Sequence, residues 1–171
     1  LTPGMVAVGR LAPRWLARAP GAPWFRAAPM DDHTAVRDPA STAPQRPLVI
    51  VAGFGPIGRR VADRLTADGF DASIIELNPA TVRDETKRGR NMIYGDVAGE
   101  EVLREAGIER AAALVITVPD EDAALRACAA ARRLSKGIVL VARTASADSA
   151  AAASRHGAEY VVKEEDGAAH A

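Results

Sequence analysis

The sequence predicts an α/β fold built on a doubly wound parallel sheet. Between residues 48 and 162, six short apolar runs of four to six residues alternate with five segments in which apolar residues recur at helical spacing. Continuous apolar runs are typical of strands that helices cover on both faces, and their alternation with helices is the pattern of βαβ units. Right-handed crossovers then give the strand order 3-2-1-4-5-6, with a ligand crevice between strands one and four.

The predicted elements follow one another with clear boundaries. The first strand is Leu48–Gly53 (LVIVAG), and a glycine turn leads into a helix over Ile57–Ala67, which Gly69 ends. Asn78 as cap and Pro79 as first helical residue begin the second helix. The remaining strands are Ala72–Leu77, Asn91–Tyr94, Ala113–Val118, Ile138–Ala142 and Glu159–Val162, and the remaining helices are Pro79–Arg88, Gly99–Ala106, Asp120 or Glu121 through Leu134, and Ser146–Arg155.

Length, charge and cysteine content exclude several classes of protein. The chain has 171 residues, enough for one domain, with 22 basic residues against 22 acidic ones. A net charge of zero argues against a nucleic-acid binder, which usually carries a strongly basic domain or stripe. The single cysteine, Cys128, excludes a disulfide scaffold and a multi-cysteine zinc site, and its Ala-rich helix predicts that it is core. The sequence has no run of about 18 uninterrupted apolar residues, the length that a helix needs to span a bilayer.

The first 47 residues differ from the rest of the chain. They hold eight of the 11 prolines and six Arg against three Asp, whereas residues 48–171 carry 16 basic and 19 acidic groups. Because prolines interrupt helices and strands alike, residues 21–47 are expected to form a linker without a fold. Before the linker, Met5–Ala19 can form one amphipathic helix with Leu11, Trp15 and Leu16 on one side.

The sharpest functional signal is the run Gly53-Phe54-Gly55-Pro56-Ile57-Gly58, which has the spacing GxGxxG. It follows the first predicted strand and opens the first predicted helix, the context of a dinucleotide-binding loop in a Rossmann-like fold. In such a loop Gly53 permits the tight turn, Gly55 lets backbone amides approach a pyrophosphate, and Gly58 permits close packing of helix on strand. The helix N-terminus then attracts phosphate. The alternative is that these glycines only make a tight turn.

Glu76 lies at the end of the second predicted strand, about 20 residues after the glycines, where an acid accepts hydrogen bonds from ribose hydroxyls. A carboxylate there repels a 2′-phosphate, and neither Leu77 nor Asn78 supplies an arginine to hold one. NAD or another adenine nucleotide is therefore preferred to NADP. The alternative is a solvated acid at a strand end.

Other strand ends face the same crevice. Asp96 after the third strand and Thr117 at the fourth are expected to line the adenosine pocket, and Arg143 after the fifth strand to neutralise phosphate.

The groups that a dehydrogenase needs to handle a proton are not evident. Of the three histidines, His33 is in the linker, His156 precedes a turn and His170 is in the tail. Neither Tyr94 nor Tyr160 has a lysine four residues further on. No catalytic residue and no metal ligand are assigned, and the nucleotide is predicted to be sensed and not consumed.

Five segments stand out along the chain: VIVAGFGPIGRRVADRL at Val49–Leu65, IIELNP at Ile74–Pro79, YGDV at Tyr94–Val97, LREAGIERAAALVITVPD at Leu103–Asp120 and HGAEYVV at His156–Val162. Through these segments, residues 48–165 resemble the RCK N-terminal domain, also called the TrkA-N or KTN domain. The segment between strands three and four is more specific than the glycines, because it separates these domains from ordinary dehydrogenase folds.

The resemblance implies a regulatory function. Such domains form the cytosolic part of potassium channels, potassium uptake systems and KefB/KefC-type cation:proton antiporters, where they bind NAD(H), AMP, ADP or ATP, form homodimers and bias the attached pore or carrier. Carried over by motif, the cofactor-binding residues are Gly53, Phe54, Gly55, Pro56, Ile57 and Gly58 for phosphate, Glu76 for ribose, and Asp96, Val97, Thr117 and Arg143 for the rest of the cleft. Many members carry a basic residue at the position of Pro56, so this sequence favours NAD(H), AMP or ADP over ATP.

The resemblance also implies a domain plan and a place in the cell. Residues 1–20 resemble the cytosolic end of a transmembrane helix, 21–47 the linker, 48–165 the nucleotide-binding domain and 166–171 a tail. The domain would then act at the cytoplasmic face of the cell membrane, attached to a transport domain in the same full-length chain. The alternatives are a stand-alone soluble subunit of a potassium uptake complex and a small NAD-dependent oxidoreductase or a fragment of one.

Overall fold

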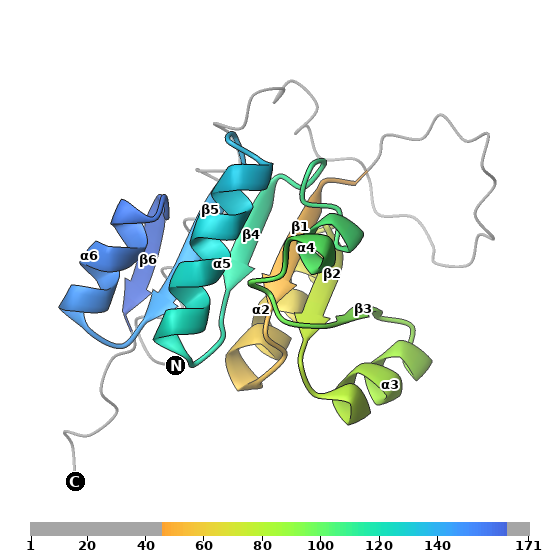
Figure 1. Cartoon of the computed structure of the whole chain (residues 1–171). Helices are drawn as coiled ribbons and strands as arrows, with labels where there is room; N and C mark the ends of the chain where they lie inside the picture. Colours follow the sequence, from red (N-terminus) through yellow and green to blue (C-terminus); the bar gives the residue numbers. More distant parts are fainter. Residues whose placement is uncertain (1–45, 164–171) are drawn as a thin grey trace, which may run out of the picture. The chain divides into compact units, whose positions relative to one another are not determined.

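Six parallel strands form one sheet in the order β3-β2-β1-β4-β5-β6 (Figure 1). The coordinates are a computed structural model, and it describes residues 46–163. The predicted fold class and strand order are confirmed, whereas the predicted helix Met5–Ala19 and all but the last two residues of the predicted linker lie outside the described residues. The strands are β1 Leu48–Ala52, β2 Asp71–Glu76, β3 Asn91–Tyr94, β4 Ala113–Ile116, β5 Val139–Thr144 and β6 Tyr160–Lys163.

The helices begin where the sequence supplies caps. Asn78 Oδ1 accepts the N–H groups of Ala80 and Thr81, and Asp120 accepts the N–H of Ala123. Within the described residues, the helices are α2 Pro56–Ala67, α3 Pro79–Lys87, α4 Glu100–Glu105, α5 Glu121–Leu134 and α6 Ala147–Arg155. In this part of the chain, no helix is long and apolar enough to cross a membrane.

Five predicted strand ends differ from the structure. β1 ends at Ala52, one residue before the predicted end, β4 ends at Ile116, two residues before it, and β6 ends at Lys163, one residue after it. β5 continues to Thr144, two residues beyond the predicted end, because its last residues pair with β6 up to Thr144 and Lys163. β2 ends at Glu76, and the side chain of Leu77 is exposed beyond it.

The helices lie in two layers. Helices α2 and α3 contact β1, β2 and β3, whereas α4, α5 and α6 contact β3, β4, β5 and β6. Figure 1 shows α5 in front of the sheet and α2 behind it. This arrangement follows from right-handed crossovers that wind outward from β1 in both directions. It brings the ends of β1, β2 and β4 together where the strand order reverses, which is where ligands bind in such sheets.

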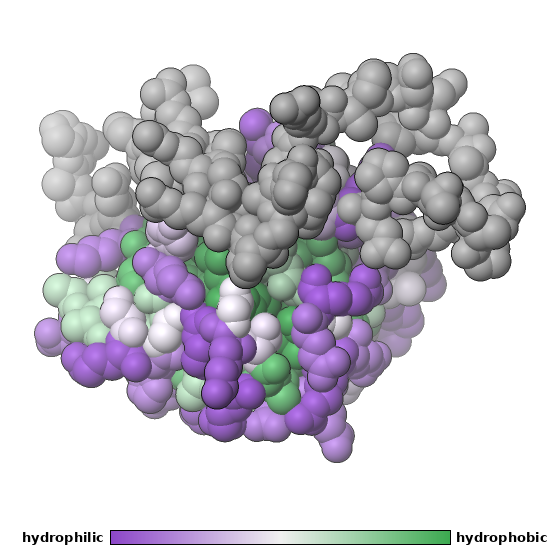
Figure 2. All heavy atoms as spheres, turned by 90° about the horizontal axis from the view of Figure 1, so that it is seen from above, coloured by the Kyte–Doolittle hydropathy of each residue, from purple (hydrophilic) through white to green (hydrophobic). Residues whose placement is uncertain are grey.

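The main core lies between the sheet and the second helix layer. Ile50, Leu114 and Leu140 from the strands pack with Leu103 of α4 and Cys128 of α5, all fully buried. Cys128 is fully buried, which confirms the prediction that this cysteine is core, and this burial raises the pKa of its thiol to about 11. Seen from above, polar side chains surround the apolar ones on the visible surface of the described residues (Figure 2).

Candidate functional site

Gly53 makes the tight turn at the carboxyl end of β1. Its φ of +91° is a conformation that residues with side chains rarely adopt. Its N–H donates to the carbonyl oxygen of Ile75 at 2.8 Å, and its own carbonyl oxygen accepts the hydroxyl of Thr117 at 3.0 Å. The predicted turn is therefore present and is tied to both neighbouring strands.

Gly58 allows α2 to lie directly on this turn. A Cβ atom at Gly58 would stand 1.9 Å from the carbonyl oxygen of Gly53 and 2.8 Å from Thr117 Oγ1. Neither distance is possible for a real side chain, so the close approach predicted for the third glycine is confirmed.

Gly55 differs from both of these glycines. It is the N-cap of α2 with an ordinary φ of −67°, and a Cβ atom there would have no protein atom within 4 Å. Neither backbone strain nor protein packing requires glycine at this position. The space beside it is open and borders a helix N-terminus whose cap makes no side-chain hydrogen bond. Such a terminus leaves N–H groups without intrahelical partners, which suits a phosphate group.

Glu76 fastens the glycine loop to the end of β2. Its Oε2 accepts the N–H of Phe54 at 2.7 Å, and its Oε1 accepts the N–H of Asn78 at 2.8 Å. An ionised carboxylate has about four lone-pair positions. With two of them in use, the half-buried Glu76 retains capacity to accept ribose hydroxyls while it holds the loop.

A buried ion network supports the other side of the loop, and sequence reasoning missed it. Glu85 of α3 is only 3% exposed and accepts hydrogen bonds from Arg59 at 3.0 Å, Arg88 at 2.7 Å and Arg90 at 2.9 Å. The guanidinium groups of Arg59 and Arg90 lie 4.6 and 5.3 Å from the centre of the Phe54 ring. The loop residue Phe54 is thus buried beneath two cations that the same carboxylate holds.

The three arginines set the charge state of Glu85. Burial raises the pKa of Glu85, but the hydrogen bonds and charges of the arginines outweigh it, so the pKa lies below its usual value of 4.5. The carboxylate is therefore ionised at neutral pH. Among the described residues, no group of three His, Cys, Asp or Glu could hold a metal ion.

The remaining predicted site residues fall into different places. Thr117 braces the loop, because its hydroxyl lies 2.9 and 3.0 Å from the carbonyl oxygens of Ala52 and Gly53. Asp96 is exposed and accepts the N–H of Ala98 in the turn before α4.

Core packing locates Val97, and strand pairing locates Arg143. The Val97 side chain is buried in the core, so only its backbone is available to a ligand. Arg143 is half-buried and follows Ala142, which pairs with Ile116. It therefore lies at the same edge of the sheet as Thr117, which follows Ile116.

Comparison with known proteins gives one family. Residues 49–164 match the model of the TrkA-N domain. YbaL of Escherichia coli (strain K12), named for cation/proton antiport, is 29% identical over 113 residues, which are 66% of this chain and 20% of YbaL. A Trk system potassium uptake protein TrkA homolog of Pyrococcus horikoshii is 31% identical over 96 residues, 56% of this chain and 42% of that protein. The chain thus spans a fifth to two fifths of these relatives.

Solved structures agree with this match. The TrkA-N domain of Escherichia coli YbaL superposes with a TM-score of 0.67 at 27% identity, covering 71% of this chain and 90% of that chain. The Shewanella denitrificans Kef CTD in AMP-bound form gives 0.62 at 30% identity, with coverage of 68% and 71%. GsuK bound to ADP gives 0.60 at 27% identity, with coverage of 68% and 30%. The GsuK channel bound to NAD, 16% identical with a TM-score of 0.62 over 92% of this chain and 27% of that chain, shares the fold.

Proposed function

This chain belongs to the TrkA-N domain family, and we propose from that premise that it is a nucleotide-binding regulatory domain that gates a potassium or other monovalent cation:proton antiporter, or a potassium transport system. The open space at Gly55 beside the N-terminus of α2 carries the nucleotide part of this proposal. Relatives named for cation/proton antiport and potassium uptake support the transport part.

The nucleotide would lie across the carboxyl ends of β1 and β2. The backbone of the Gly53–Gly58 loop and the first turn of α2 would hold its phosphates, and Glu76 would accept its ribose hydroxyls. The AMP and ADP of the two related structures favour an adenine nucleotide. Pro56 has neither an N–H group nor a charged side chain for a terminal phosphate, so NAD(H) is the first candidate, followed by AMP and ADP.

The geometry also favours sensing over catalysis. Both oxygens of Glu76 accept backbone N–H groups, and the hydroxyl of Thr117 lies against two carbonyl oxygens. These are structural hydrogen bonds, and they leave neither side chain placed to move a proton to or from a reacting group.

Regulation then requires two states that the nucleotide distinguishes. A ligand shifts an equilibrium only by its difference in affinity for the two states. The two states are two arrangements of a homodimer of residues 48–165, at the cytoplasmic face of the membrane. Residues 1–20 and the linker 21–47 connect each domain to a transport domain in the full-length protein.

Calorimetric titration of the whole chain with NADH, NAD, AMP, ADP and ATP tests this function. We expect one nucleotide to bind at micromolar concentration, with no turnover. Gly55→Ala fills the space beside the loop without backbone strain, so it should weaken binding by at least about tenfold. Gly137→Ala is the matched control, because a Cβ atom there also meets no protein atom within 4 Å.

Three results would contradict the proposal. Equal binding by the Gly55→Ala variant would mean that the loop is only a turn. If none of the five nucleotides binds, the domain is not a nucleotide sensor. If the chain oxidises NADH together with a small substrate, it is an oxidoreductase.

A further inference from the structure

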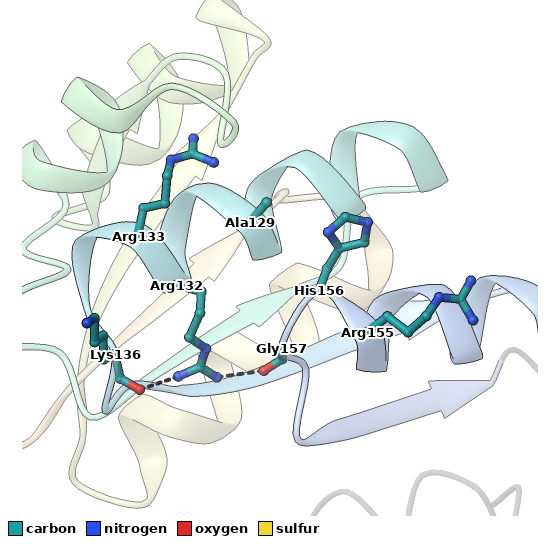
Figure 3. A pocket seen from close by; sticks show the side chains of 7 residues that line it. All are labelled: Ala129, Arg132, Arg133, Lys136, Arg155, His156 and Gly157. Carbon is teal, nitrogen blue, oxygen red and sulfur yellow. Dashed lines mark hydrogen bonds between the residues drawn. The ribbon is translucent and has the colours of Figure 1, made fainter.

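A pocket of about 510 Å³ lies between the C-terminal ends of α5 and α6 (Figure 3). The two turns beside it lead into β5 and β6, so the pocket lies at the amino edge of these strands. The glycine loop lies at the carboxyl edge of β1, and the two sites are therefore separate. The lining of the pocket is strongly basic and consists of Ala129, Arg132, Arg133, Lys136, Arg155, His156 and Gly157.

Arg132 is fully engaged in holding the two turns together. Its Nη1 donates to the carbonyl oxygens of Lys136 at 2.7 Å and Ile138 at 2.9 Å. Its Nη2 donates to the carbonyl oxygen of Gly157 at 2.6 Å and to the carboxylate of Glu159 at 2.8 Å. One guanidinium group thus binds three carbonyl oxygens and one carboxylate of the two turns.

The other cations remain available. Arg133 uses its Nε to bind Glu100 at 2.9 Å, and its side chain is 61% exposed. The exposed side chains of Lys136, Arg155 and His156 have no hydrogen-bond or ion-pair partner within residues 46–163. This local excess of positive charge contrasts with residues 48–171 as a whole, which carry 16 basic and 19 acidic groups.

Helix capping accounts for only part of this charge. Cations in the last turn of a helix are stabilised by its C-terminal carbonyl groups, and Arg132, Arg133 and Arg155 occupy such positions. Arg132 binds carbonyl oxygens of the turns that follow the helices, and not the terminal carbonyl groups of α5 or α6. Lys136 lies beyond Ser135, the C-cap of α5, so helix capping does not explain its place at the pocket.

We propose that this pocket is a second anion site, independent of the nucleotide site, which takes a ligand with several phosphate groups. Guanidinium groups donate parallel hydrogen bonds to phosphate oxygens, and a lysine adds a compact charge. Figure 3 shows Lys136 and Arg155 at opposite ends, with His156 over the gap between the helices. Because the cations surround the pocket instead of meeting at one point, they suit a polyphosphate or a row of lipid headgroups, in which different cations contact different phosphate groups.

Amide chemical shifts of the ¹⁵N-labelled whole chain, titrated with inorganic tripolyphosphate, test the soluble source of phosphate. We expect shifts at residues 129–136 and 155–157, and an affinity at least about tenfold lower in the Lys136→Gln/Arg155→Gln double variant. The double variant Arg83→Gln/Lys87→Gln removes the same charge from exposed positions of α3 and should bind as the original chain does. Gly55→Ala should leave the pocket shifts unchanged, which separates this proposal from the nucleotide site.

Flotation with vesicles tests the lipid source. The chain should float with phosphatidylglycerol vesicles but not with phosphatidylcholine vesicles, and Lys136→Gln/Arg155→Gln should lose this binding. That result would support a lipid headgroup as the ligand of the site, even if tripolyphosphate does not bind. The proposal is overturned when tripolyphosphate shifts no amide at residues 129–136 and 155–157 and phosphatidylglycerol vesicles do not retain the chain. It is also overturned when Lys136→Gln/Arg155→Gln binds both probes as well as the original chain does.

Discussion

At the scale of single residues, the three glycines of the loop have three different physical causes. Glycine is required at Gly53 by the backbone conformation and at Gly58 by the close approach of the carbonyl oxygen of Gly53. Neither cause applies at Gly55. Structural need therefore explains two of the glycines but not Gly55, which the proposed function assigns to phosphate binding. This separation makes Gly55 a better probe of binding than Glu76, whose loss would also release the N–H groups of Phe54 and Asn78.

The glycines should accordingly differ in stability measurements. Gly58→Ala forces α2 away from β1, and overpacking of this kind typically costs about 1–3 kcal/mol or more. Gly55→Ala should cost no more than about 1 kcal/mol, the usual effect of a poorer N-cap. Urea denaturation of both variants measures the difference. Equal free energies of unfolding would show that α2 does not rest on Gly53 as described.

Glu85 gives a prediction about acid stability. Its folded pKa lies below its usual value, so its stabilising effect is present above the unfolded pKa near 4.5 and is lost as pH falls through the folded pKa. Glu85→Gln should therefore lower the melting temperature at pH 7, and the gap to the original chain should narrow below about pH 4. Glu101→Gln, on an exposed carboxylate of α4, is the control. A gap that stays constant from pH 7 to about pH 3 would contradict this assignment.

At the scale of elements, the sequence predicted most of the fold because the strands are short and mostly apolar and because four of the five described helices, all except α4, start with a side-chain cap or a proline. Strand β5 was predicted too short, since the residues that extend it, Arg143 and Thr144, are polar and owe their strand conformation to pairing with β6. The hydrophobic pattern of a short segment does not predict pairing with a neighbouring strand.

The candidate site was predictable in part for the same reason. The loop and Glu76 follow from spacing along the chain, and the structure places them in contact. Glu85 was missed because its three arginines come from α2 and from the turn after α3, and only the folded chain brings them to one carboxylate. Val97 was included through its motif, although its side chain belongs to the core.

The clamp made by Arg132 should control the local stability of α6 and β6. Arg132→Ala leaves three carbonyl oxygens and Glu159 without this donor, and we expect a loss of about 2–3 kcal/mol from charged hydrogen bonds. Arg132→Lys keeps the charge but cannot reach all four acceptors, so it should recover only part of the loss. Hydrogen exchange of the β6 amides measures the effect. Unchanged protection in Arg132→Ala would show that the two turns are held together by packing alone.

At the scale of the whole molecule, the proposed regulation depends on linkage between nucleotide binding and self-association. A nucleotide that binds one dimer arrangement more tightly must shift the equilibrium between the two arrangements. Where its affinity for the dimer differs from its affinity for the monomer, dimerisation and nucleotide binding also change each other by the same factor. Sedimentation velocity of the whole chain, with and without the nucleotide that calorimetry identifies, should therefore show a shift in the dimer fraction or in the dimer's sedimentation coefficient. Gly55→Ala should need at least about tenfold more nucleotide for the same shift, because it binds the ligand more weakly. A chain that binds nucleotide yet stays monomeric in all conditions would break this link, and gating would then have to act through contacts with the transport domain alone.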